Sequence, residues 1–402
     1  MKFMDEFSSP TASPEELVAF YCTGLPGVRV GCGGTHQTAR VSGGEAASAS
    51  TTTSRKAHKS VESLETAGGA TPAPTSAPLA EDEAGKRRRR TGLSRPFTWS
   101  NTVSSVDSVI SFAEASSRGP EEVALKHLGA STSAGCTTDY RLLQTGWALA
   151  DAVLVTGAIL RAEPALRCVP TDPGITGAAA AALAAADERQ PLGTEQVERA
   201  SSPLQVVLSA SCDFLARDFQ PRCELVWGSS DGGARALVCT TPRTYARLQE
   251  SGVLNTLPSH VRVKGIRGRD SCAKGADEQV DLVAMMAALR DEHGVERLDV
   301  SAGGVVIRDL IRLRLLDELR LTLAGQLCGP LSSGGLLRPS LFPAVDVDGD
   351  AAAAAAAADG PVATFGPESS PLLKYVGIRS IRQPGDDHAS HLFLRCRMQY
   401  RH

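Results

Sequence analysis

Apolar residues between positions 97 and 324 alternate between the spacing of strands and the spacing of helices. Residues 97–103 alternate large and small side chains, which predicts a first strand. Residues 139–150 carry apolar side chains at helical spacing and lead directly into residues 152–155, a β-branched run typical of a buried parallel strand. Further strands are predicted at residues 204–208, 224–227, 236–239, 261–266 and 297–300.

Helices are predicted between these later strands. One begins at Pro242, whose fixed φ suits a first helical turn, one covers residues 278–290 and ends near Gly294, and one covers residues 305–316. This βαβ rhythm predicts an α/β fold with a mostly parallel sheet and helices on both faces. Residues 319–323 and 394–401 alternate strictly, which predicts antiparallel C-terminal edge strands with one buried and one wet face.

Composition divides the 402 residues into one folded domain and several stretches of low complexity. Residues 1–95 are rich in Ser, Thr, Gly, Ala and Pro, and we expect them to be disordered. Residues 96–402 then form the domain, with low-complexity insertions near 170–202 and 345–370. The N-terminal region also permits a second interpretation, as an organellar targeting segment, because residues 31–60 hold one acidic residue among many hydroxyl and basic residues.

Charge and cysteine content exclude several classes of function. The 42 basic and 45 acidic residues nearly balance, so nothing favours nucleic acid or a membrane surface as partner. No apolar run is long enough to span a bilayer. Ten cysteines without a CxxC pair predict a reduced compartment and no metal site. We expect a cytoplasmic protein, with a plastid or mitochondrion as the alternative.

The most informative segment for chemistry is residues 298–310. A strand ends there, Gly303 and Gly304 allow a tight turn, and a helix begins at Val305. The first amides of a helix have no partner within the helix and face outward with the positive end of its dipole. This turn therefore predicts an anion site at the carboxyl end of a strand, although a plain strand-to-helix turn explains the glycines equally well.

Five segments in order resemble the reductase domain of the bifunctional deaminase-reductase of riboflavin biosynthesis. In chain order, residues 104–108 resemble the family's S-x-D-G, residues 150–158 its ADAILVG and residues 161–166 its RADDPxL. The fourth segment is the glycine pair with L-D-E-L-R-L-T-L-A at 316–324, and the fifth is residues 392–397, which resemble the final strand. The resemblance implies a dihydrofolate-reductase-like fold. It also implies an NADPH-dependent reductase of a phosphorylated ribosylaminopyrimidine, commonly a homodimer.

The resemblance also implies roles for individual residues. Gly303, Gly304 and Val305 would hold the cofactor phosphates, and Gly157 and Ala158 would pass under the nicotinamide or its ribose. Glu163 would lie beside the cofactor and Leu166 on the substrate side. Asp107 would be the catalytic and substrate-binding acid.

Three departures from the family pattern keep other hypotheses open. Ala302 replaces a glutamate before the glycine pair, Ser108 replaces a glycine, and Gly146 falls near the position of a substrate arginine. A second hypothesis is therefore a non-catalytic family member that acts as a nucleotide-binding or interaction module. A third is a dihydrofolate-reductase-like enzyme that acts on pterins.

Overall fold

The computed structural model describes about half of the chain in detail. The described residues are 5–6, 12–22, 25, 94–110, 137–186, 202–211, 235–267, 279–331, 338, 340–341, 370–382 and 390–400. The strand predicted at 224–227 and the insertion at 345–370, apart from its last residue, lie outside them.

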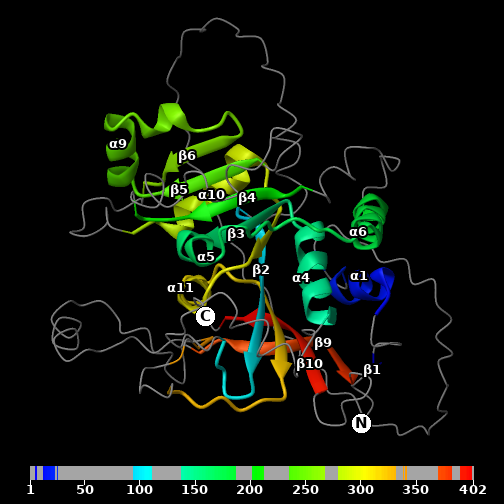
Figure 1. The fold of residues 1–402 in the computed structure, drawn as a ribbon. Helices are drawn as coiled ribbons and strands as arrows, with labels where there is room; N and C mark the ends of the chain where they lie inside the picture. Colours follow the sequence, from blue (N-terminus) through cyan, green and yellow to red (C-terminus); the bar gives the residue numbers. More distant parts are fainter. Residues whose placement is uncertain are drawn as a thin grey trace, which may run out of the picture.

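The described strands form one ten-stranded sheet, in the order β1-β9-β10-β8-β2-β7-β3-β4-β5-β6. The run from β8 to β6 is parallel throughout, and β10 lies antiparallel to both β8 and β9. The predicted α/β class with antiparallel C-terminal pairing is confirmed (Figure 1). The strands are β1 Asp5–Glu6, β2 Phe97–Ser105, β3 Ala152–Thr156, β4 Leu204–Leu208, β5 Ala236–Thr240, β6 Val261–Gly265, β7 Arg297–Val300, β8 Glu318–Ala324, β9 Leu372–Arg382 and β10 Ser390–Gln399.

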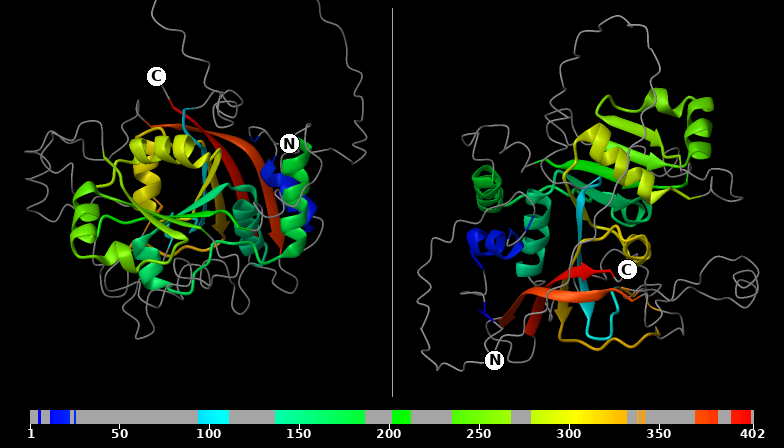
Figure 2. Two further views of the ribbon diagram at one scale, coloured as in Figure 1. Left: turned by 90° about the horizontal axis from the view of Figure 1, so that it is seen from above. Right: turned by 180° about the vertical axis from the view of Figure 1, so that it is seen from behind.

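Helices cover both faces of the sheet and bury two apolar cores (Figure 2). Side chains of α1, α4, α6 and α9 lie in one core, and those of α10 and α11 lie in the other. Two of these helices carry the signals that the sequence predicts: α9 begins at Pro242, and Gly294 follows α10 in the left-handed conformation. The helices are α1 Pro14–Cys22, α4 Thr137–Leu149, α5 Gly157–Ala162, α6 Pro173–Ala186, α9 Pro242–Glu250, α10 Leu282–His293 and α11 Gly304–Arg312, with a 3₁₀ turn at Val253–Thr256.

The helix predicted over 305–316 is shorter than expected, because α11 ends at Arg312. Arg314 has a φ of 57°, in the left-handed region that breaks a helix. Leu315 and Leu316 are buried in the turn that leads into β8, so their apolar character comes from this connection rather than from a helix face.

Two stretches that the sequence assigned to low complexity contain packed helices. Within residues 1–95, α1 forms because Ser13 and Glu16 cap each other's backbone amides, at 2.9 and 3.2 Å. The expectation of disorder is therefore wrong for residues 12–22, where Leu17 is fully buried. The remaining residues before 94, apart from 5–6 and 25, lie outside the described part.

The alanine-rich stretch near 170–202 is likewise not a loose insertion in its first half. Alanine has the highest helix propensity, and Asp172 caps the start of α6 by accepting from the amides of Gly174 and Ile175. Ile175 and Ala179 are fully buried, and α6 contacts both α1 and α4. Small side chains allow this close helix contact.

The two alternating segments at the end of the chain are not edge strands. β8 lies between β2 and β10, while β9 and β1 lie outside β10. The expected wet face is wrong for Arg320 and Arg395, which are 3% and 0% exposed, whereas Gln399 near the end of β10 is exposed. The helix α1 lies over Arg320 and Arg395, so the alternation there marks buried ion pairs instead of a surface exposed to water.

Candidate functional site

A cavity of about 370 Å³ lies at the carboxyl end of β7. β7 stops at Val300, while its neighbour β2 continues to Ser105 and leaves a gap between β2 and β3. This is the place where open α/β sheets bind ligands. The cavity is lined by side chains from β2, β8, α4 and α1, by residues that follow β3, and by the turn that follows β7.

The predicted glycine turn opens onto this cavity. Gly303 is exposed and lines it, and Gly303 also precedes α11 without offering a side-chain cap. A Cβ added at Gly303 would meet nothing within 4 Å. Gly304 is buried and Val305 is 53% exposed, and both lie in the first turn of α11, where amides lack partners within the helix. The turn can therefore present backbone N–H donors to an anion.

The predicted residues after β3 reach the cavity in part. Glu163 and Leu166 line it, whereas Gly157 and Ala158 are not among the lining residues. Gly157 and Ala158 form the first turn of α5 instead of an open loop, because Thr156 caps this helix by accepting from the amide of Ile159 at 3.2 Å.

Asp107 lies away from the cavity. Its carboxylate accepts hydrogen bonds from Ser105 Oγ at 2.5 Å and from the amide of Gly329 at 2.6 Å, and the amide of Cys328 donates to it as well. Burial alone would raise the pKa of Asp107, but these hydrogen bonds outweigh it and lower the pKa. The geometry therefore favours a role in joining two loops, and Asp107 does not line the cavity with the other candidates.

A buried carboxylate lies beneath the cavity, on β7. Asp299 is 0% exposed, and one of its oxygens accepts from Trp99 Nε1 at 2.7 Å and from Asn101 Nδ2 at 2.5 Å. Its other oxygen accepts from Ser301 Oγ at 3.0 Å. Burial raises the pKa of Asp299 to about 6. Because Asn101 and Ser301 both line the cavity, Asp299 fixes two of its walls from behind.

The helix α1 closes the cavity through Tyr21. Its hydroxyl donates to Asn101 Oδ1 at 2.6 Å, and its ring lies 4.1 Å from the guanidinium carbon of Arg320. Arg320 is held on its other side by the ring of Trp99, at 4.5 Å. Burial lowers the pKa of Arg320. Tyr21 thus joins the N-terminal helix to β2 and β8.

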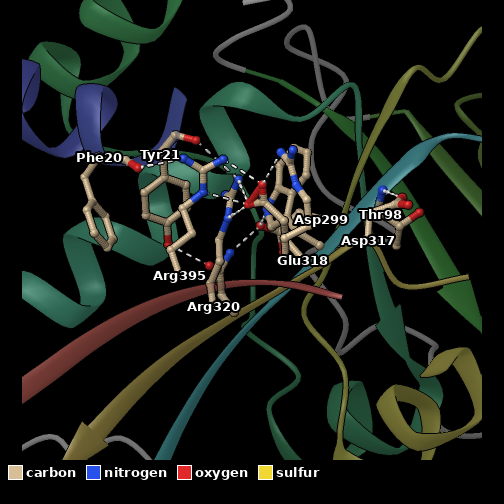
Figure 3. Close-up of polar contacts among 11 residues, drawn as sticks. Phe20, Tyr21, Thr98, Asp299, Asp317, Glu318, Arg320 and Arg395 are labelled. Atoms are coloured by element: carbon tan, nitrogen blue, oxygen red, sulfur yellow. Dashed lines mark hydrogen bonds and ion pairs between the residues drawn. The ribbon is translucent and has the colours of Figure 1, made fainter. Parts of the chain in front are cut away.

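Buried ion pairs hold the end of α1 on the sheet. Figure 3 shows Arg395 and Arg320 between the strands and this helix. Arg395 bonds both oxygens of Glu318, at 2.7 and 2.6 Å, and donates to the carbonyl oxygen of Phe20 at 3.1 Å. Burial alone would raise the pKa of Glu318, but Arg395 and Arg320 lower it. The arginines also place positive charge at the carboxyl end of α1, where the helix dipole favours it.

A second acidic group with an unusual pKa lines the cavity itself. Asp139, in the first turn of α4, is 9% exposed, and burial raises its pKa to about 6 against the hydrogen bond of Thr322. The walls of the cavity as a whole are largely apolar and aromatic, and they include Phe20, Trp147 and Phe393.

Sequence reasoning missed the contributions of α1 and of Asp139 to the site. A signal for α1 existed in the sequence, since Ser13-x-x-Glu16 with Pro14 between them is a helix-start pattern before an apolar run. Asp139 stood inside the predicted helix of residues 139–150, but no local pattern distinguishes a carboxylate that faces a cavity from one that faces water.

The described residues contain no group of three or more potential metal ligands, and no described helix is long and apolar enough to cross a membrane. The fold and its cavity define an open α/β protein with a ligand site at the carboxyl ends of its strands.

A family model described as the RibD C-terminal domain matches residues 96–352. This match spans more than half of the chain, so the protein belongs to that family, and the resemblance is confirmed. No curated protein matches the chain in sequence.

Several solved structures are similar at low identity. Acinetobacter baumannii RibD, form 2, is 12% identical with a TM-score of 0.44, over 79% of this chain and 61% of that chain. A pyrimidine reductase-like protein from Corynebacterium diphtheriae is 16% identical with a TM-score of 0.45, over 76% and 93%. The riboflavin biosynthesis reductase Rib7 of Saccharomyces cerevisiae is 14% identical with a TM-score of 0.40, over 76% and 91%. The chain spans about three fifths of the length of RibD.

Proposed function

We propose that this protein is an NADPH-dependent reductase of a phosphorylated ribosylaminopyrimidine. The observation that carries the proposal is the exposed turn at Gly303, which opens onto a cavity at the carboxyl end of β7. Membership in a family of reductase domains supports it. The homodimer that the resemblance implies belongs to the same proposal.

The residues of the turn fit a dinucleotide. Gly303 leaves open space where a side chain would otherwise stand, and the first amides of α11 provide donors for a diphosphate. Bound NADPH would supply a hydride to an electrophilic carbon of the substrate. Glu163 and Leu166 line the same cavity and would contact the ligands there.

The other walls would position the acceptor and exclude water. Asn101 and Ser301 are fixed by Asp299, so their polar atoms have a defined direction before any ligand binds. Phe20, Trp147 and Phe393 make the cavity largely apolar, which strengthens the polar contacts made inside it.

A second candidate is a nucleotide-binding module without catalysis. The position of Asp107 favours it, because the expected catalytic acid is bound to loop amides and does not line the cavity. Turnover separates the two candidates: a protein that binds NADPH but never oxidises it with the pyrimidine phosphate would be the binding module.

Fluorescence titration of NADPH with Gly303→Val tests the proposal. A valine side chain at position 303 would occupy the open space without a clash in the fold, and we expect NADPH affinity to fall at least about 10-fold. Gly177→Val is the matched control, since Gly177 is exposed on α6, also has nothing within 4 Å of an added Cβ, and does not line the cavity. Wild-type protein that does not bind NADPH would refute the proposal.

A further inference from the structure

A chain of hydrogen bonds leads from the buried carboxyl group of Asp299 to the wall of the cavity. Ser301 Oγ donates to Asp299 Oδ1 at 3.0 Å, and Trp147 Nε1 donates to Ser301 Oγ at 3.0 Å. Ser301 is partly exposed and lines the cavity together with Trp147, whereas Asp299 is fully buried behind them. Ser301 therefore connects a buried acid to the space in which a ligand would lie.

The donors around Asp299 decide which of its two oxygens can hold a proton. Oδ2 accepts from Trp99 Nε1 at 2.7 Å and from Asn101 Nδ2 at 2.5 Å, so a proton on this oxygen would displace one of them. Oδ1 instead has Ser301 as its partner, and a hydroxyl group accepts a hydrogen bond as readily as it donates one. A proton on Oδ1 would therefore reverse this hydrogen bond without breaking it.

This reversal changes what Ser301 presents to the cavity. Trp147 occupies one lone pair of Ser301 Oγ in both states, because an indole nitrogen only donates. When Asp299 is ionised, the hydroxyl hydrogen of Ser301 points at the carboxylate and a lone pair remains for a ligand. When Asp299 is protonated, its own hydrogen takes that lone pair, and the hydroxyl hydrogen of Ser301 can point into the cavity.

Burial and charge place this exchange of a proton close to neutral pH. Burial raises the pKa of Asp299 to about 6, while Arg320 and the hydrogen-bond donors favour the carboxylate. Of the described residues, Arg320 on β8 is the charged group that faces Asp299. Tyr21 of α1 and Cys168, which follows α5, are neutral neighbours, because burial raises the pKa of both. An acid with such a pKa can both hold and release a proton near pH 7.

We propose that Ser301 is a catalytic residue that delivers the proton consumed in the reduction, and that Asp299 supplies this proton through it. The inference rests on the proposed function. In a ribosylamine the bond between C1 and the ring oxygen of the ribose breaks, and its electron pair stays on that oxygen. Hydride from NADPH, which becomes NADP⁺, forms the new C–H bond at C1. Ser301 Oγ gives its hydrogen to the ring oxygen and takes the hydrogen of Asp299, which water later replaces.

Tryptophan NMR tests the proton exchange without substrate or cofactor. The chain has three tryptophans, so the full-length protein labelled with ¹⁵N gives few indole N–H signals, and single replacements by phenylalanine assign them. We expect the signals of Trp99 and Trp147 to shift together at about pH 6, and Asp299→Asn to abolish both shifts. Ser301→Ala should remove the shift of Trp147 alone. A wild-type Trp147 signal that does not titrate would overturn the inference.

Turnover against pH tests the catalytic role. The probes are 2,5-diamino-6-ribosylaminopyrimidinone 5'-phosphate and 5-amino-6-ribosylaminouracil 5'-phosphate, each with NADPH. Because Asp299 must hold its proton, wild-type kcat should fall about 10-fold per pH unit above about pH 6. The amide of Asp299→Asn can donate to Ser301 but transfers no proton, so kcat should be about 100-fold lower and lose this dependence, with KM within about 3-fold.

Variants at Ser301 and at a distant acid complete the design. Ser301→Ala should lower kcat as Asp299→Asn does, and Ser301→Thr, which keeps the hydroxyl, should recover most of it. Asp291→Asn, at an exposed position on α10 outside the cavity, should behave as the wild type. A pH dependence that persists in Asp299→Asn would assign the proton to another acid of the cavity, such as Asp139, and would overturn the inference.

The proposed function and this inference fail in different ways. Wild-type protein that does not bind NADPH removes the proposed function, while the tryptophan signals still report the exchange between Asp299 and Ser301. Wild-type protein that binds NADPH and reduces neither probe would overturn the catalytic role of Ser301.

Discussion

Gly146 shows how one backbone position shapes the floor of the cavity. A Cβ at this position would lie 2.4 Å from both Asn101 Nδ2 and Asp299 Oδ2. The glycine thus makes room for the hydrogen bond between these two side chains. It also explains in physical terms why the arginine expected from the family pattern is absent near this position.

Gly146→Ala should destabilise the protein in spite of alanine's better helix propensity. The clash displaces a buried hydrogen bond, at a cost on the order of 1–3 kcal/mol. Urea unfolding would measure this loss. Gly177→Ala is the control, and with open space around its Cβ it should gain about 0.5–1 kcal/mol. Equal effects at the two positions would contradict the proposed clash.

Ionisation of Asp139 should make stability depend on pH. Its pKa is about 6 in the folded protein, against an ordinary value of 3.8. Below pH 3.8 both states hold the proton and Asp139 contributes nothing. As the pH rises toward 6 the unfolded chain loses its proton first, so the free energy of unfolding falls, by an amount on the order of 3 kcal/mol. The Asp139→Asn protein should lack this fall. Urea unfolding from pH 4 to pH 8 would measure the free energy of unfolding of both proteins, and we expect the difference between them to change with pH. A difference that stays constant over this range would contradict the prediction.

Residues of the glycine turn could be predicted because their chemistry is local. Gly303 and Gly304 follow a strand and precede a helix within a few positions, so the sequence alone indicates donors at a strand end. Asp299 could not be predicted, because its partners Trp99 and Asn101 are about 200 positions away and their approach depends on strand order.

Among the helices, α1 shows that a stretch of low-complexity composition can contain a packed helix. The helix is short and lies among residues of low complexity, yet Leu17, Phe20 and Tyr21 are all buried. It also lies outside the part of the chain that the family model matches. Its position over β8 and β10 was not predictable, because the strict alternation in these strands does not reveal whether water or a helix covers the polar face.

Leu17→Ala tests how much α1 contributes to the fold. Leu17 is 0% exposed, and its truncation should cost about 2–5 kcal/mol, as for other buried leucines. Glu15→Ala, at an exposed position of the same helix, should change the free energy of unfolding by less than about 1 kcal/mol. Guanidinium unfolding gives both values. A Leu17→Ala protein as stable as the wild type would mean that α1 is not part of the folded core.

For the whole molecule, the sequence predicted the class and the local order of strands and helices well. The βαβ rhythm implies parallel neighbours, since a helical crossover returns the chain to the same end of the sheet. The placement of β7 between β2 and β3 was not predictable, because strand order depends on long-range packing. That placement creates the cavity. The sequence therefore predicted the amide donors of the glycine turn, but it could not predict which other residues line the cavity.

The contact between α1 and the last strand has a consequence for biosynthesis. Arg395 and Phe20 are separated by 375 positions, and Tyr21 and Arg320 by 299. A ribosome releases the N-terminal helix first, its apolar partners in α4 and α6 later, and its guanidinium partners near the end, so α1 cannot complete its contacts with the sheet until most of the chain has been made. Nascent chains of this protein should therefore fold late and depend on chaperones that shield exposed apolar segments.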